Sequence, residues 1–144
     1  MNVSPQKIAA FRRFLLSWYD KNKRDLPWRN TTDPYKILVS EVMLQQTQVD
    51  RVLPKYRTFL ETFPTVEALA KASPADVLKA WSGLGYNRRA LYVQQAAQQI
   101  LEQRTFPQTA EELQQLPGIG AYTSCSILIF AFNADEVAID TNIR

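Results

Sequence analysis

Signals for the start of a helix recur along the whole chain, and they constrain its fold more than any other feature. Most of them place a Ser, Thr or Asp that can cap a helix before a proline, or three residues before a glutamate. They are Ser4-Pro5, Asp33-Pro34, Thr65, Ser73-Pro74 and the capping box Thr109–Glu112. Apolar residues between these signals recur at helical spacing, and no alternating strand pattern persists. The sequence therefore predicts an all-α fold.

Short connections between the expected helices predict a compact bundle. The first helix is expected from Pro5 to about Tyr19, and a long one from Arg88 to about Arg104. Between them, Asp33-Pro34 opens the helix that carries ILVSEVMLQQTQV at 37–49, and Pro54 lies near the start of the next helix.

Composition narrows the chemistry that the chain can perform. Its 144 residues, 46% of them hydrophobic, are enough for one globular domain, and no residue is a histidine. Acid–base chemistry must therefore come from carboxylates, Tyr, Lys or the single thiol. That thiol, Cys125, cannot form an intrachain disulfide, so we expect a reduced, intracellular protein with Cys125 as a small core residue. A net charge of +3 permits a polyanionic partner.

Glu41 interrupts an otherwise apolar helix. Apolar residues lie three or four positions away on its own face and also on the other sides of the helix. Burial raises the pKa of a carboxyl group, so Glu41 is a candidate for an acid that is protonated at neutral pH. A carboxylate paired with an arginine such as Arg24 or Arg29 is the alternative, and both interpretations stay open from this residue alone.

Three further features could carry chemistry. The segment LPGIGAYT at 116–123 turns at two glycines into an apolar helix, where free N–H groups favour an anion; it is either a DNA-binding hairpin or a plain turn between helices. Asp140 precedes Thr141 at a helix start and could be a cap or a catalytic carboxylate. Trp28-Arg29 and the stretch GYNRR at 85–89 combine aromatic and basic side chains, which suit stacking on bases and pairing with phosphates.

Taken together, these motifs resemble a known family. LPWR at 26–29, PYKILVSEVMLQQTQV at 34–49, WSGLGY at 81–86, LPGIGAYT and the Asp of AIDTN occur in the order and approximate spacing of the helix-hairpin-helix DNA glycosylases. The chain most closely resembles the MutY-type adenine DNA glycosylases, over residues 24–144. The resemblance implies an all-α helix-hairpin-helix glycosylase fold with a six-helix barrel core and an additional N-terminal helix.

The resemblance also implies a reaction and its catalytic residues. Family members flip an adenine opposite guanine or 8-oxoguanine out of the duplex and hydrolyse its N-glycosidic bond. Glu41 matches the glutamate that protonates adenine N7, and Asp140 matches the aspartate that stabilises the oxocarbenium-like sugar. Asn142 and Tyr122 match polar groups beside that centre. Bifunctional relatives carry a lysine at the position of Tyr122, so a monofunctional enzyme is expected.

Further residues match the family's substrate pocket and DNA-binding surface. Gln46 matches a side chain wedged into the base stack, Tyr86 one beside the opposite guanine, and Gly118 and Gly120 the phosphate-binding hairpin. The remaining matches are Arg24, Leu26, Trp28, Arg29, Leu44 and Val49 at the pocket, and Arg88 and Thr123 at the DNA.

Two departures from the family pattern leave alternatives open. Asn87 stands where many members have a second tyrosine, and Thr141 where they have a glycine. Tyr122 also occurs in thymine glycosylases. A thymine or oxidised-pyrimidine glycosylase of the same superfamily, or a non-catalytic helix-hairpin-helix DNA-binding module, therefore remains an alternative.

The resemblance finally sets expectations for the organisation of the whole protein. Residues 1–144 match the N-terminal part of the catalytic domain: a helix at 1–22, a helical barrel at about 30–137 and the hairpin at about 109–133. No metal is expected in this part of the protein. In full-length members the cysteines that hold the [4Fe–4S] cluster follow this part, and a C-terminal domain also follows it. Without the cluster region, the first helix is expected to expose an apolar face. We expect a cytoplasmic, nucleoid-associated monomer that binds mismatch-containing duplex DNA and no membrane.

Overall fold

The computed structural model describes residues 3–140, and within this range every regular element is a helix. The prediction of an all-α chain is therefore confirmed for the described residues. Residues 3–140 contain eight α-helices and a single 3₁₀ turn, η1. In chain order the elements are α1 Pro5–Asn22, η1 Pro27–Arg29, α2 Pro34–Leu44, α3 Val49–Thr62, α4 Val66–Lys71, α5 Pro74–Trp81, α6 Arg88–Gln103, α7 Ala110–Gln114 and α8 Ala121–Phe132.

The predicted caps start their helices. The side chains of Ser4, Asp33, Thr65, Ser73 and Thr109 each accept a hydrogen bond from a backbone N–H in the first turn of the following helix. The start of α3 differs from the prediction, because this helix begins at Val49 and contains Pro54 in its second turn. Thr141, a further expected start signal, lies outside the described residues.

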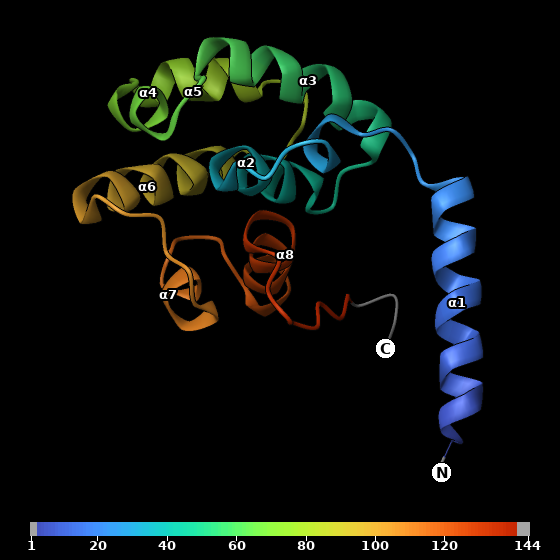
Figure 1. The fold of residues 1–144 in the computed structure, drawn as a ribbon. Coiled ribbons are helices and arrows are strands. Elements are labelled where there is room, and N and C mark those ends of the chain that lie inside the picture. Colours follow the sequence, from blue (N-terminus) through green and yellow to red (C-terminus); the bar gives the residue numbers. More distant parts are fainter. Residues whose placement is uncertain (1–2, 141–144) are drawn as a thin grey trace.

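The helices form layers around a central pair (Figure 1). Helices α2 and α6 lie in the middle, with α3, α4 and α5 on one side and α7 and α8 on the other. Helix α2 is apolar on nearly all sides and packs against α3, α6 and α8. A helix that is hydrophobic all round belongs in a core, so the helix that carries Glu41 is the centre of the domain.

Helix α1 stands apart from this body (Figure 1). None of its residues is buried, and its apolar side chains face solvent, with Phe11 63% exposed. The expectation that this helix exposes an apolar face is confirmed for Ile8, Leu15 and Trp18 as well. No described helix is both long and apolar enough to cross a membrane.

Candidate active site

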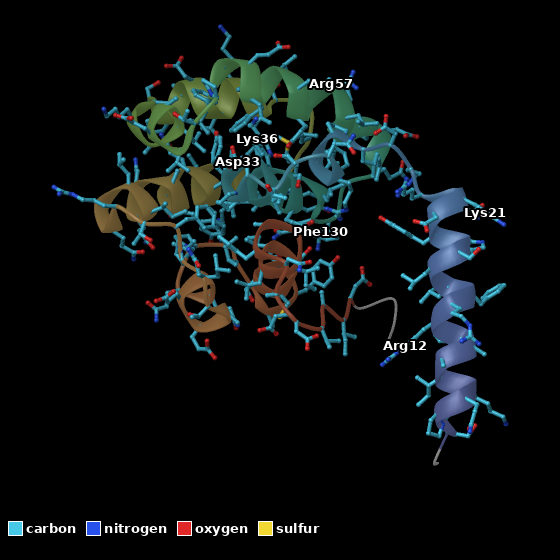
Figure 2. The ribbon with its side chains drawn as sticks, in the orientation of Figure 1. Arg12, Lys21, Asp33, Lys36, Arg57 and Phe130 are labelled. Atoms are coloured by element: carbon cyan, nitrogen blue, oxygen red, sulfur yellow. The ribbon has the colours of Figure 1, made fainter. Side chains whose placement is uncertain are left out.

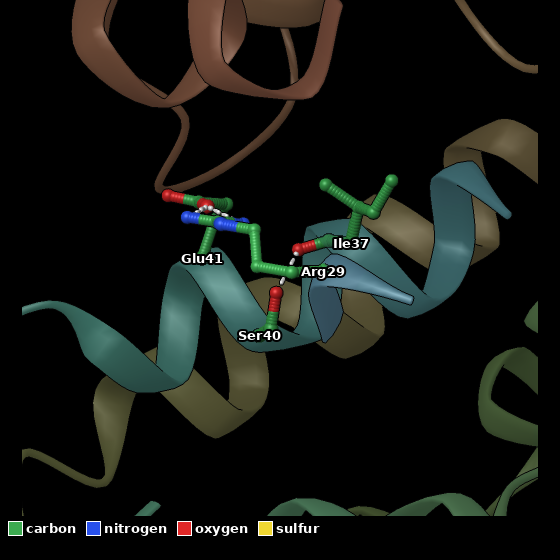
Figure 3. Close-up of polar contacts among 4 residues, drawn as sticks. All are labelled: Arg29, Ile37, Ser40 and Glu41. Carbon is green, nitrogen blue, oxygen red and sulfur yellow. Dashed lines mark hydrogen bonds and ion pairs between the residues drawn. The ribbon is translucent and has the colours of Figure 1, made fainter. Parts of the chain in front are cut away.

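Glu41 lies on the third turn of α2, and its side chain is only 4% exposed. Arg29, from the 3₁₀ turn η1, approaches it from the side (Figure 3). Both terminal guanidinium nitrogens of Arg29 donate to Glu41 Oε1, over 3.4 and 3.5 Å. Phe130 of α8 lies over the same guanidinium, 3.7 Å from Cζ to the ring centre. Arg29 is therefore held between an aromatic face and the carboxyl group.

Burial and the arginine act on Glu41 in opposite directions. Loss of solvent raises the pKa of the carboxyl group, and this effect outweighs the lowering by Arg29 and by the neighbouring Ser126. The two bonds from Arg29 are longer than is usual for a charged pair, which limits its effect. Both interpretations made from the sequence are thus correct in part: Glu41 is paired with Arg29, and its pKa is still raised.

Helix α8 brings a second set of polar groups to the same place. It begins at Ala121, directly after the glycine turn, so Tyr122 and Thr123 lie in its first turn beside α2. Burial raises the pKa of Tyr122, and the negative charges of Glu41 and Asp140 raise it further. Tyr122 is therefore a neutral phenol at physiological pH, close to both carboxylates, although 41% of it remains exposed.

One cavity of about 690 Å³ connects these groups. It is bounded by residues from the η1 segment, the end of α2, the following loop, the start of α8 and the C-terminal segment. Nine of the residues predicted from the sequence line it: Arg24, Arg29, Glu41, Leu44, Gln46, Val49, Tyr122, Thr123 and Asp140. Residues more than a hundred positions apart in the chain, such as Arg24 and Asp140, thus line one cavity.

Two residues assigned to the pocket do not line this cavity. Trp28 is fully buried and packs edge-on against Tyr56, with ring centres 5.2 Å apart. Leu26 is half-buried against the core. Both therefore support the η1 segment that carries Arg29 and do not border the cavity itself. Asn142 lies outside the described residues.

Arg89 belongs to the stretch GYNRR, whose arginines were expected to pair with phosphates, but it is buried and bonded within the domain. Its guanidinium enters the C-terminal end of α2 and is only 8% exposed. Nη1 donates to the carbonyl oxygens of Val42 at 2.9 Å and Met43 at 3.0 Å and also to that of Gln45, while Nη2 donates to Thr47 Oγ1 at 3.0 Å. Arg89 thus satisfies the carbonyls left open at the end of the helix. Its position in GYNRR, next to the exposed Arg88, gave no signal of this role.

Arg89 also fixes the loop that borders the cavity. In this loop Gln46 adopts a left-handed backbone, with φ of 55°, and its side chain is exposed. The side chain of Gln45 instead contacts the glycine turn and α8: its Nε2 donates to Gly118 O at 3.3 Å and to Thr123 Oγ1 at 3.4 Å. The loop is therefore tied to α6 on one side and to the glycine turn on the other.

A second hollow, of about 600 Å³, adjoins the loop. Tyr86, Arg88 and Gln46, all assigned to the DNA-binding surface from the sequence, contribute to its lining. Tyr86 also has a left-handed backbone, with φ of 48°, and is 65% exposed. Left-handed non-glycine residues with exposed side chains cluster at functional sites, and here two of them face one hollow.

The glycine turn between α7 and α8 uses its two glycines differently. Gly118 has φ of +76°, and a Cβ there would lie 3.1 Å from the Cβ and Cδ2 of Tyr92. Gly120 has an ordinary extended backbone, and a Cβ there would meet nothing within 4 Å. Gly118 is therefore needed by the fold, whereas Gly120 leaves open space before the N–H groups of α8.

The residues of this chain do not fit an iron–sulfur cluster. Such a cluster requires four cysteine thiolates, and the chain has one cysteine. Within residues 3–140 no group of three or more metal-binding side chains is assembled. Cys125, expected to be a small core residue, is only partly buried on α8, with Sγ 4.0 Å from Glu136 Oε2.

Comparison with known proteins agrees with this geometry. The profile of the HhH-GPD superfamily of base excision DNA repair proteins matches residues 39–144, well over half of the chain. The chain belongs to this superfamily. An adenine DNA glycosylase of Mycolicibacterium smegmatis is 45% identical over 147 residues, covering 100% of this chain and 48% of that protein. The human adenine DNA glycosylase is 43% identical over 148 residues, covering 95% of this chain and 27% of its own length. The chain thus spans about half or less of these relatives.

Solved HhH-GPD structures share the fold. A thermostable thymine-DNA glycosylase superposes with a TM-score of 0.87 at 28% identity, covering 95% of this chain and 64% of that one. An endonuclease III in a non-covalent complex with DNA superposes with a TM-score of 0.81 over 99% of this chain and 66% of that one; at 19% identity it supports the fold alone. The helix-hairpin-helix glycosylase fold predicted from the sequence is confirmed.

Proposed function

We propose that the protein containing this chain is a monofunctional DNA glycosylase that removes adenine mispaired with guanine or 8-oxoguanine. The observation that carries the proposal is Glu41, a buried carboxyl group of raised pKa at the wall of a cavity shared with Tyr122 and Asp140. The 45% identity to an adenine DNA glycosylase over the whole chain supports adenine as the target base.

Glu41 acts as the general acid. The N-glycosidic bond breaks more easily once the departing base is protonated, and this requires a donor that keeps its proton near neutral pH. Burial raises the pKa of Glu41 and so favours its protonated form, and the cavity gives a flipped base access to it. Arg29, fixed by Phe130, orients the carboxyl group by binding Oε1 and leaves the other oxygen free of this pair.

Asp140 stabilises the sugar as positive charge develops on it. It is half-buried on the cavity wall, close enough to Tyr122 to raise the pKa of that phenol. Two carboxyl groups in unlike environments can divide the work in this way, one neutral as an acid and one ionised as an electrostatic partner. None of the described residues lining the cavity is a lysine, so no amine is positioned there to form a Schiff base.

The surface around the cavity suits a distorted DNA duplex. Gln46 and Tyr86 present exposed side chains from left-handed backbones next to the cavity mouth, where they would contact the disturbed base pair. The open space at Gly120 lets a phosphate reach the N–H groups at the start of α8. We further propose a monomeric enzyme acting on nucleoid DNA in the cytoplasm, with a [4Fe–4S] cluster held by cysteines outside this chain.

Single-turnover cleavage by the full-length protein tests this function. Duplexes carrying adenine opposite 8-oxoguanine should lose adenine, and those carrying thymine opposite guanine should react much more slowly. The substitution Glu41→Gln keeps the shape of the side chain but removes the acid, and should lower the rate by at least about a hundredfold. Borohydride added during the reaction should trap no covalent protein–DNA adduct.

Three results would contradict the proposal in different ways. Equal rates for Glu41→Gln and the unmodified protein would remove Glu41 from catalysis. Preferential release of thymine would show that the target base is thymine, as in the thymine-DNA glycosylase whose fold is similar. Failure of the full-length protein to release any base, while it still binds the duplex, would leave the non-catalytic module as the explanation.

A further inference from the structure

The hydroxyl group of Ser126 is buried in the domain without a hydrogen-bond partner. The residue is 1% exposed, and Oγ makes no hydrogen bond within the described part of the chain. The neighbouring serine, Ser124, is equally buried but donates to Ala121 O at 2.9 Å. Leaving a buried hydroxyl unpaired costs roughly 1–3 kcal/mol of folding free energy. Stability of the fold therefore does not explain a serine at position 126.

The register of α8 places Ser126 over the catalytic carboxyl group. Tyr122, Ser126 and Phe130 are spaced four residues apart and therefore share one face of the helix. Tyr122 lines the cavity with Glu41, and Phe130 stacks on the Arg29 that binds Glu41. Figure 2 shows Phe130 on the part of α8 nearest α2, and Figure 3 shows a helix lying over the side of α2 that carries Glu41. Ser126 lies between the two contacts, on the same face.

We propose that Ser126 is a positioning residue whose hydroxyl donates a hydrogen bond to the Glu41 carboxylate as that group gives its proton to the base. This role rests on the glycosylase function proposed above and adds a residue to it. The Ser126 hydroxyl lowers the pKa of both the Glu41 carboxyl and the Tyr122 phenol as a hydrogen-bonding neighbour. At neither group does Oγ reach full hydrogen-bond geometry in the resting site. The Ser126 hydroxyl and the Glu41 carboxyl are thus neighbours whose hydrogen bond tightens when Glu41 becomes charged.

The timing of this bond is what makes it useful. In the proposed reaction Glu41 starts as the neutral acid with its proton directed at the base, so no charged acceptor faces Ser126 at that stage. When the proton leaves, the carboxylate becomes a buried anion, and a hydrogen bond to a charged group is stronger than one to a neutral group. The bond thus stabilises the product of proton transfer more than its starting state, as catalysis requires.

Other charged and titratable groups also face Glu41 and must be held constant in a test. Arg24 and Arg29 come from the segment before α2, Tyr122 from α8, and Asp140 from the C-terminal segment. A single substitution that removes only the Ser126 hydroxyl leaves all four in place.

Ser126→Ala and its matched control Ser124→Ala in the full-length protein test the proposal. Without the hydroxyl the carboxylate is less stable, so the Glu41 pKa rises. A general acid acts in its protonated form, so the fall in single-turnover rate with rising pH should move to higher pH in Ser126→Ala. The maximal rate should drop by roughly tenfold. Ser124→Ala should leave the position of this fall unchanged, and adding Ser126→Ala to Glu41→Gln should cause no further loss.

A readout independent of activity separates this role from the proposed reaction. The side-chain carboxyl carbon of Glu41, assigned in ¹³C spectra by its absence in Glu41→Gln, should titrate at higher pH in Ser126→Ala than in the unmodified protein. The melting temperature should stay equal or rise, because an unpaired buried hydroxyl has been removed. If the Glu41 titration does not move, or if Ser126→Ala only lowers the melting temperature, the proposal is wrong. If the unmodified protein releases no base, the proposed function is wrong. The titration of Glu41 then still tests whether Ser126 interacts with its carboxyl group.

Discussion

A carboxyl group placed where Glu41 lies is costly to the folded state. Removing an ionised carboxylate from water costs several kcal/mol, even after the protein relaxes around it. Its partner Arg29 contacts it only through bonds of 3.4 and 3.5 Å, longer than the 2.7–2.9 Å typical of charged pairs. The outcome is a raised pKa for Glu41, because burial outweighs the attraction of Arg29.

This balance predicts how stability depends on pH. A carboxyl group with a raised pKa binds its proton more tightly when folded than when unfolded, so its ionisation weakens the fold as pH rises through the folded pKa. Glu41→Gln removes that ionisation and can still accept a hydrogen bond from Arg29. The variant should therefore unfold at a higher temperature than the unmodified protein at pH 7–8. The difference should shrink as pH falls towards the ordinary carboxyl pKa.

Thermal unfolding of the full-length protein across pH measures this effect. Glu61→Gln is the matched control, because Glu61 is an exposed carboxylate on α3. Its melting temperature should differ little from that of the unmodified protein at every pH. A Glu41→Gln protein less stable than the unmodified one at pH 7–8 would show that the Arg29 pair, not burial, dominates the free energy at this position.

At the scale of elements, the turn between α7 and α8 decides whether the site exists. The turn must reverse direction within a few residues and deliver Tyr122 and Thr123 to the cavity. Gly118 makes this possible in two ways: its backbone is left-handed, and it lacks a Cβ, which would lie only 3.1 Å from the Tyr92 side chain. The position of α8 therefore depends on α6 through one glycine.

Substitution of the two glycines should separate folding from binding. Gly118→Ala forces a side chain into a strained backbone and against Tyr92, and should cost about 1–3 kcal/mol in the free energy of unfolding. Gly120→Ala meets no atom within 4 Å and should cost much less. It should instead weaken duplex binding, because the added methyl group occupies the space before the N–H groups of α8.

Urea unfolding and duplex titration of the two variants check this prediction. Gly118→Ala should shift the unfolding midpoint clearly and Gly120→Ala only slightly. Equal shifts for both would mean that the structural distinction between these glycines is wrong. Unchanged duplex affinity in Gly120→Ala would mean that no phosphate approaches the start of α8.

At the scale of the whole molecule, Arg89 of α6 fixes the end of α2 and the loop that follows it, which borders the cavity. Its donors bridge α6 to the end of α2 and to the loop before α3, between residues more than 40 positions apart in the sequence. Each of these bonds joins a guanidinium to a carbonyl or hydroxyl group that would otherwise be poorly satisfied. Such long-range ties determine where the Gln46 loop stands relative to Glu41.

Arg89→Met should show the size of this contribution. Methionine keeps part of the apolar stem but leaves the carbonyls of α2 without donors, so we expect a loss of about 2–4 kcal/mol in the free energy of unfolding. Arg88→Met is the control on the same helix, since Arg88 is exposed, and should change stability by less than about 0.5 kcal/mol. Denaturant unfolding of both variants provides the comparison, and equal losses would contradict the assigned role of Arg89.

The sequence by itself determined the helices and predicted most of the residues that line the cavity. Capping residues such as Asp33 and Thr109 act on N–H groups only two or three residues away, so their effect is local and can be read from the chain. Motif spacing identified Glu41, Tyr122 and Asp140, which the structure places around one cavity.

Only the tertiary structure decided how these residues meet. Trp28 lies in the core although its motif indicated the pocket, and Arg89, not its neighbour Arg88, turns inward to cap α2. Ser126 gave no sequence signal, because a small polar residue in an apolar helix shows neither its partner nor the lack of one. These properties depend on contacts between segments far apart in the chain, and on the water that their packing excludes, which local spacing does not encode.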